Sequence, residues 1–232
     1  MGTQNHQTKK EKKKKNPKAI PCSAYCKRNE KRGGMNEDSC NRKSLDVILA
    51  SAAARYFFIE HRDLKKDQET ALPRLLVVCR ASSSLEANPI VVDGLGLTGT
   101  LSAKGYFRGS GEAFSGGSIH LLYDRFNDDK ELEATVRHEL VHAMDHSVHG
   151  LDMMTCAGLA CSEVRAAAAG ECDGLGALFK GRCVMQNATN STSMVFPSEG
   201  RHCVRTIFAQ CSSLSPTASP SPYIKGLLGK MQ

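Results

Sequence analysis

The chain has 232 residues and a hydrophobic fraction of 41%, which is enough apolar material for one buried core. No apolar run is long enough for a membrane-spanning helix, so the sequence predicts a soluble protein that can still sit on a membrane surface. The net charge of +7 is unevenly placed, because residues 1–33 carry eleven Lys/Arg and two Glu, a balance of +9 that leaves −2 for the rest.

Residues 1–43 are predicted to form a basic, disordered arm, because TKKEKKKKNPK is rich in lysine and has no apolar periodicity. The functional alternatives for this arm are a nuclear-import or nucleic-acid patch, and attraction to an anionic membrane. We expect neither a secretory signal nor a mitochondrial presequence, because no apolar segment follows the arm and it is poor in arginine. The Ser/Pro-rich residues 213–232 predict a flexible tail, which leaves 44–212 as the folded domain.

Hydrophobic periodicity predicts a helix over 44–60, with Ser44 as its candidate N-cap, and strands in PRLLVVCR and SIHLLYDRF. The clearest helix follows in NDDKELEATVRHELVHAMDH, where Asn127 or Asp128 can cap the first turn. An alanine-rich helix is expected over 152–170. The Gly/Ser-rich residues 81–117 give no clear pattern, and the pattern breaks up again beyond Gly174.

The capped helix contains the motif HExxH at His138, Glu139 and His142. Four residues make slightly more than one helical turn, so both imidazoles point to the same side and can share one zinc ion. Glu139 is displaced around the helix and is placed to act on water rather than on the metal. The alternative is a solvated helix with two incidental histidines.

An open catalytic zinc site needs a third protein ligand, and the pattern HExxHxxGxxH does not supply it. Asp145 and Val148 stand where that pattern has Gly and His, and His149 comes one residue late. Asp145 lies on the ligand face of the helix, but a supporting role is more natural, in which it accepts the spare ring N–H of a ligand histidine. His146 and His149 are expected on the surface.

Glu163 is the favoured third ligand, since it lies 21 residues after His142 on the next expected helix. That spacing suits two antiparallel helices that bring the glutamate back to the metal, and a His, His, Glu set suits hydrolytic zinc. The alternative is a surface carboxylate paired with Arg165 or a lysine.

Ten cysteines are about twice the number expected of a cytosolic enzyme of this length. Paired CxxC spacings of a structural zinc site are missing, so disulfides are favoured, with a reduced chain of buried thiols as the alternative. Disulfides in a chain without a secretory signal fit the mitochondrial intermembrane space.

The expected chemistry is peptide-bond hydrolysis, in which Glu139 takes a proton from water and passes it to the departing amine. The strand SIHLLYDRF precedes the motif helix and, as an edge strand, would bind an extended peptide by backbone pairing. The predicted fold is α+β, a small zincin-like metalloprotease domain with an HExxH active-site helix, a short edge sheet and disordered tails.

Three stretches in this order, HELVHAMDH, LACSEVRAAAAGEC and HCVR, resemble the mitochondrial inner-membrane metalloprotease family that processes and assembles the ATP synthase. The resemblance implies a Zn²⁺ endopeptidase of the intermembrane space, peripheral to the inner membrane. It also implies that the substrate is the precursor of the ATP synthase proton-channel subunit, that the chain assists assembly of the membrane sector, and that no nucleic acid takes part. The family's zinc histidines correspond to His138 and His142, and its catalytic glutamate to Glu139.

Two other functions stay open from the sequence. One is a non-proteolytic ATP synthase assembly chaperone that retains the motif. The other is a nuclear, DNA-associated zinc protease steered by the lysine-rich arm.

Overall fold

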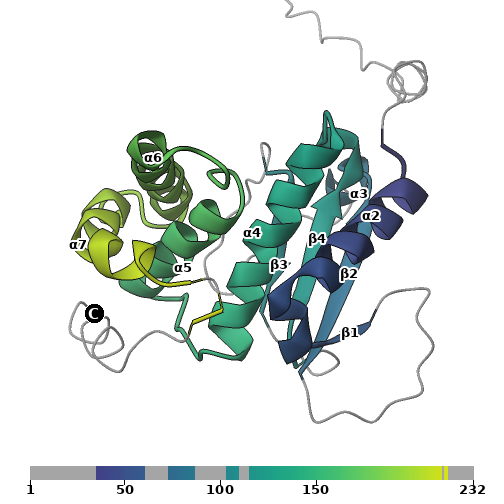
Figure 1. Ribbon diagram of the computed structural model, residues 1–232, viewed down its shortest axis with the longest axis horizontal. Helices are drawn as coiled ribbons and strands as arrows, with labels where there is room; N and C mark the ends of the chain where they lie inside the picture. The colour runs from purple at the N-terminus through teal and green to yellow at the C-terminus, as the bar shows by residue number, and fades with distance from the viewer. Residues whose placement is uncertain (1–34, 61–72, 87–102, 110–114, 216, 219–232) are drawn as a thin grey trace, which may run out of the picture. The chain divides into compact units, whose positions relative to one another are not determined.

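The computed structural model describes residues 35–60, 73–86, 103–109, 115–215 and 217–218, which fold as a mixed sheet beside a set of helices (Figure 1). Most of the predicted arm and most of the predicted tail lie outside these residues. The mixture of helices and a small sheet confirms the α+β class. No helix in the described ranges is long and apolar enough to cross a membrane.

The sheet has the strand order β1-β2-β4-β3, with β1, β2 and β4 parallel and β3 antiparallel to β4. Strand β2 alternates because Leu75, Val77 and Cys79 face the core. The strand bounds are β1 Phe58–Glu60, β2 Arg74–Arg80, β3 Gly105–Arg108 and β4 Ser118–Leu122.

Strand β4 is an interior strand, so the expectation that it forms an edge is wrong. His120 of β4 pairs with Val78 of β2 on one side and with Tyr106 of β3 on the other. The edge strands are β1 and β3, and β3 is a four-residue strand inside the Gly/Ser-rich stretch. So short a strand leaves too little alternation to be recognised from sequence.

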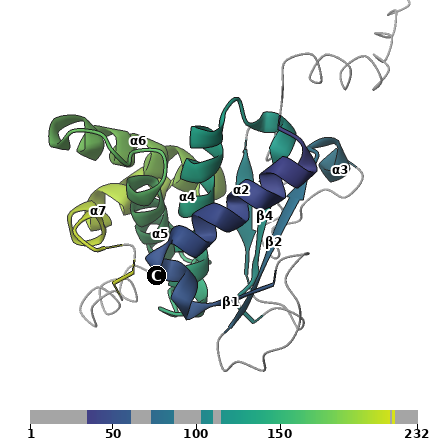
Figure 2. The ribbon, with the colours of Figure 1, turned by 45° about the vertical axis from the view of Figure 1, so that its right-hand side comes forward.

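Helices α2 and α4 cover one face of the sheet (Figure 2). Helix α2 spans Glu37–Ala50 and begins seven residues before the predicted start, because the Asn36 side chain accepts from the Ser39 N–H and caps it. Ser44, the expected cap, is buried inside the helix. Residues 37–43, assigned to the arm, are therefore helical. The helix stops at Ser51 and a 3-10 helix, η1 (Ala52–Tyr56), follows.

Helix α4 spans Asp129–Ser147 and carries the HExxH motif as predicted. The Asp128 side chain accepts from the Glu131 N–H, and the Glu131 carboxylate accepts in return from the Asn127 N–H. Leu132 and Leu140 point from α4 into the core against the sheet. The short elements α3 (Ser83–Glu86) and η2 (Tyr123–Arg125) lie in the connections before it.

Helices α5 (Cys156–Ala169), α6 (Ala177–Val195) and α7 (Gly200–Ser212) enclose a second core. Eight of the ten cysteines form disulfides, which confirms that prediction for those eight; Cys22 and Cys26 lie outside the described residues. Cross-links over 47 and 50 residues each stabilise the fold by about 4 kcal/mol in the chain-entropy model. The pairs are Cys40–Cys79, Cys156–Cys203, Cys161–Cys211 and Cys172–Cys183.

The expectation that regular structure breaks up beyond Gly174 is wrong. Helix α6 lacks a side-chain N-cap, and its second half is rich in Asn, Ser and Thr, which have low helix propensity. It buries Val184, Ala188 and Thr192, one residue per turn, against the second core. Tertiary packing and disulfides therefore stabilise a helix that local sequence does not reveal.

Candidate metal centre

Helices α4 and α5 bring His138, His142 and Glu163 to one point. The Nε2 atoms of the two histidines lie 3.0 Å apart. Glu163 places Oε2 3.5 Å from His138 Nε2 and Oε1 3.6 Å from His142 Nε2. One nitrogen or oxygen atom from each residue lies within 4.8 Å of the others, a grouping that could hold a metal ion.

The second nitrogen of each imidazole already has a partner. His138 Nδ1 lies 2.9 Å from Glu171 Oε2, and His142 Nδ1 lies 2.7 Å from Ser162 Oγ. An Nδ1–H that donates to an oxygen leaves the lone pair on Nε2, directed at the common point. Outer partners of this kind fix the tautomer and orientation of metal-binding histidines.

The electrostatics of the cluster fit a cation. Burial acts to lower the pKa of His138, yet the Glu163 and Glu171 carboxylates hold that pKa well above its usual value. Glu163 Oε2 is buried and has no hydrogen-bond partner in the described structure. Two imidazole nitrogens and a buried carboxylate form a donor set that can bind a metal ion.

A second group of metal-binding type, Cys156, Cys203 and Glu199, does not fit an ion. The two sulfur atoms are bonded to each other in a disulfide, so neither is a thiolate. Within the described residues, the histidine cluster is therefore the group whose side chains could hold an ion.

Glu139 is buried beside the histidines and lines a cleft of about 610 Å³. Burial raises the pKa of Glu139 to about 8, whereas the neighbouring His138 and the Phe107 backbone of β3 act in the opposite direction. The cleft also takes its walls from β3 at Gly105 and from α6 at Ser191.

Two glycines allow the close approaches that shape this cleft. A Cβ on Gly105 would lie 2.8 Å from Thr135 Cγ2, so only glycine lets β3 pass so close to α4. A Cβ on Gly170 would lie 2.6 Å from the Ala134 carbonyl oxygen. Gly170 ends α5 against α4 and leads directly to Glu171, the partner of His138.

Sequence reasoning missed three residues of the site: Ser162, Glu171 and Ser191. Ser162 contacts the outer nitrogen of His142. Burial acts to raise the pKa of Glu163, but the neighbouring His142 and His138, with a smaller contribution from Ser191, lower it. In the sequence, only the positions of Ser162 next to Glu163 and of Glu171 next to Gly170 pointed to these two residues. Ser191 had no signal, because its helix was not predicted.

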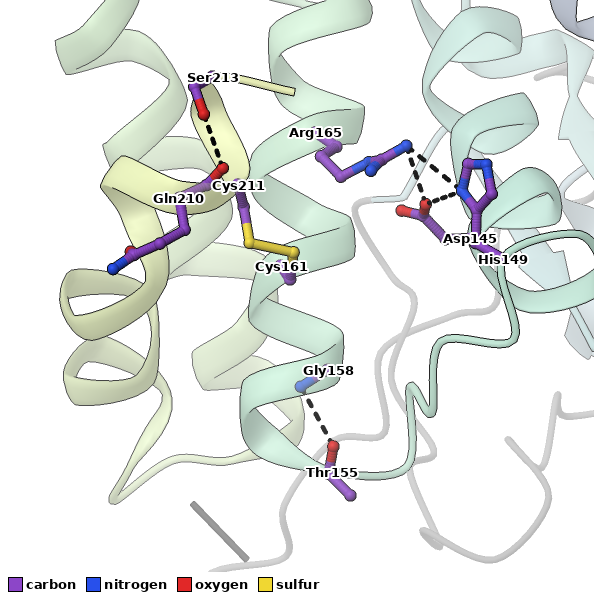
Figure 3. Close-up of a disulfide and its surroundings, with 9 residues drawn as sticks. All are labelled: Asp145, His149, Thr155, Gly158, Cys161, Arg165, Gln210, Cys211 and Ser213. Atoms are coloured by element: carbon purple, nitrogen blue, oxygen red, sulfur yellow. Dashed lines mark hydrogen bonds and ion pairs between the residues drawn. A yellow bond between two sulfur atoms is a disulfide. The ribbon is translucent and has the colours of Figure 1, made fainter. Parts of the chain in front are cut away.

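Asp145 does not support a ligand histidine, contrary to the prediction. Its Oδ1 lies 3.1 Å from His149 Nδ1 and 3.2 Å from Arg165 NH2 (Figure 3). Arg165 therefore pairs with Asp145 and not with Glu163. Because Asp145 draws it inward, His149 is buried rather than on the surface. His146 is half-buried, with its ring 5.8 Å from that of Phe107.

Comparison with known proteins places the chain in a peptidase family. A model of the Peptidase M76 family matches residues 38–216. The chain belongs to this family. A curated relative, the "Mitochondrial inner membrane protease ATP23" of Meyerozyma guilliermondii, is 32% identical over 130 residues, which are 53% of this chain and 50% of the relative. The chain thus spans about half the length of the curated relative it matches. No solved structure gives a significant match.

In this member of the Peptidase M76 family, Asp145 and Arg165 join α4 and α5, the two helices that carry the candidate metal ligands (Figure 3). Asp145 follows His142 by one helical turn, and Arg165 follows Glu163 by two residues. Both charged side chains are fully buried. The pair therefore holds α5 against α4 at the depth of the metal centre.

Replacement of Arg165 by Met is expected to lower the free energy of unfolding by about 3–5 kcal/mol, because it leaves the Asp145 carboxylate buried without its cation. Urea unfolding under oxidising conditions measures the change. The double variant Arg165→Met/Asp145→Asn is the matched control and should recover part of the loss, since no uncompensated charge stays buried. Equal destabilisation in the single and double variants would contradict this explanation.

Proposed function

We propose that this chain is a zinc metalloendopeptidase. The observation that carries the proposal is the convergence of two imidazole nitrogens and a buried carboxylate beside Glu139 in an open cleft. His138, His142 and Glu163 would hold the ion, and Glu171 and Ser162 would orient the two rings. The arrangement is zincin-like, with the motif helix α4 packed on the sheet.

The proposed reaction is hydrolysis of a peptide bond. A bound zinc ion supplies Lewis acidity, which polarises the substrate carbonyl and makes a water molecule acidic near neutral pH. Glu139 takes the proton from the attacking water at its carboxylate and gives it to the departing amine.

The peptide is proposed to bind along β3, the edge strand that lies beside α4. Gly105 of β3 lines the cleft, and β3 is paired with β4 on one side only in the described structure. An extended substrate adding to this edge would pass in front of Glu139. This role replaces the one expected for β4.

The proposed setting is the mitochondrial intermembrane space, peripheral to the inner membrane. The name of the curated relative and the four disulfides support it. The sequence resemblance supports the precursor of the ATP synthase proton-channel subunit as the substrate, with assistance in membrane-sector assembly. The proposed protease domain extends from α2 to α7, with the basic arm and the tail outside it.

Metal removal tests the proposal. We expect a strong chelator to stop cleavage of a precursor peptide, followed by mass spectrometry, and added zinc to restore it. Far-ultraviolet circular dichroism should change little, because two hydrophobic cores and four disulfides hold the fold without the ion. Undiminished cleavage by protein shown to be free of metal would contradict a metallopeptidase.

A further inference from the structure

The loop before α6 and the first turn of α6 expose three large apolar side chains within five residues. The exposed fraction is 43% for Leu175, 91% for Leu178 and 71% for Phe179. Single exposed apolar residues are ordinary on protein surfaces, whereas a contiguous group indicates an interaction site. We refer to Leu175, Leu178 and Phe179 as the α6 tip.

The α6 tip is held in place by the covalent structure around it. The Cys172–Cys183 disulfide closes the loop that contains all three side chains, and Lys180 lies 3.8 Å from Asp173 across that loop. Because the loop is closed, the backbone that carries the apolar side chains is restrained before a partner arrives. Little conformational entropy is then lost on binding.

The part of the chain that carries the α6 tip is basic relative to the rest. Residues 172–215, from the disulfide-closed loop through α7, carry four Lys/Arg and two Asp/Glu, a balance of +2 that includes the Lys180–Asp173 pair. The described residues from 35 to 171 carry 11 Lys/Arg and 15 Asp/Glu, a balance of −4. An anionic surface would therefore attract the α6–α7 hairpin and repel the sheet and α4. The two helices of this hairpin lie side by side in Figure 1.

The size of the α6 tip favours a lipid surface over a protein partner. A stable protein interface buries roughly 800 Å² on each partner, which three side chains do not supply. Interfacial membrane binding needs only a few apolar side chains below the headgroups and cations at headgroup level. Lys180 and Arg182 follow the tip directly and suit that level.

We propose that the α6 tip inserts into the apolar layer of an anionic membrane surface, with Lys180 and Arg182 at the phosphate headgroups. Ser191, on the same helix, lines the cleft twelve residues beyond Phe179, about 18 Å farther along the helix axis. This inference rests on the proposed protease function. The short distance between the α6 tip and the cleft would restrict the substrate to peptide segments that emerge close to a bilayer.

Fluorescence tests the insertion directly, because the chain contains no tryptophan. In the full-length Phe179→Trp variant, vesicles of phosphatidylcholine with about one-third anionic phospholipid are expected to shift the emission to the blue. Lipids brominated in the acyl chain should quench it. Met194→Trp is the matched control, since Met194 is 51% exposed at the other end of α6. Its emission should stay unchanged.

A second measurement separates the α6 tip from the basic arm, which also attracts anionic vesicles. Phe179→Ser is expected to weaken vesicle partitioning about ten- to a hundredfold at high salt, where attraction by the arm is screened. Unshifted emission from the Phe179→Trp variant on vesicles that bind it would overturn the proposal, as would an equal shift in the Met194→Trp variant. Equal insertion into neutral vesicles would overturn the role of charge. None of these measurements depends on proteolysis. A negative result would therefore contradict membrane insertion without contradicting the proposed enzymatic function.

Discussion

Changing Glu139 to Gln is expected to lower the rate of peptide cleavage roughly 10²- to 10⁴-fold, because the amide cannot accept a proton from water. The metal content should stay at the wild-type level, since Glu139 is not one of the three residues that converge on the common point. Gln keeps the shape of a buried side chain and removes a charge that burial disfavours, as the raised pKa of Glu139, about 8, indicates. Single-turnover cleavage and metal analysis of the same sample measure both effects.

The matched control for this variant is Glu133→Gln, which changes an exposed glutamate on the same helix and should leave cleavage unchanged. The Glu139 variant also separates protease from chaperone. A chaperone that merely retains the motif would still support ATP synthase assembly with Gln at position 139. Unreduced cleavage by the pure variant would exclude Glu139 as the base.

The second large effect is expected from Glu163→Ala, which should bring the zinc content of the purified protein far below one equivalent. Only two imidazoles would remain to hold the ion, and a hydrolytic zinc site uses three protein ligands. Metal analysis after dialysis against zinc buffers of known free concentration measures the loss. Glu163→Gln should behave in the same way, which separates loss of charge from loss of volume.

Glu171→Gln is the matched control, because Glu171 contacts the outer nitrogen of His138 and not the common point. We expect its zinc affinity to fall only about 10- to 100-fold, as for other outer partners of metal-binding histidines. A full zinc complement in the Glu163 variants would remove Glu163 from the set that holds the ion. Equal losses in the Glu163 and Glu171 variants would mean that the two carboxylates share this role.

Local sequence determined the elements in which cap, period and motif agree. Helix α4 is the clearest case: Asp128 caps it, acidic residues fill its first turn, and the HExxH spacing follows from helical geometry alone. The parallel strand β2 and the preference for disulfides were also predictable, the first from its β-branched run and the second from cysteine content.

Tertiary structure alone decided what lies between these elements. Helix α6 forms because its packing against α5 and α7, which disulfides join to each other, outweighs its own weak helix propensity. Strand β3 forms because β4 has a free edge with which β3 can pair. The expected role of Asp145 failed for the same reason. The nearest buried cation, Arg165, is twenty residues away in sequence, and no local pattern reports such a partner.

For the metal centre, the sequence by itself determined the two histidines and the glutamate between them, since one helical turn fixes their directions. It proposed Glu163 only from the expected distance between two helices. The tertiary structure brought Glu163 within 3.6 Å of both imidazoles and added Glu171 and Ser162 behind them. Residues on different elements meet only when helices pack, and packing depends on the whole core rather than on any one stretch of chain.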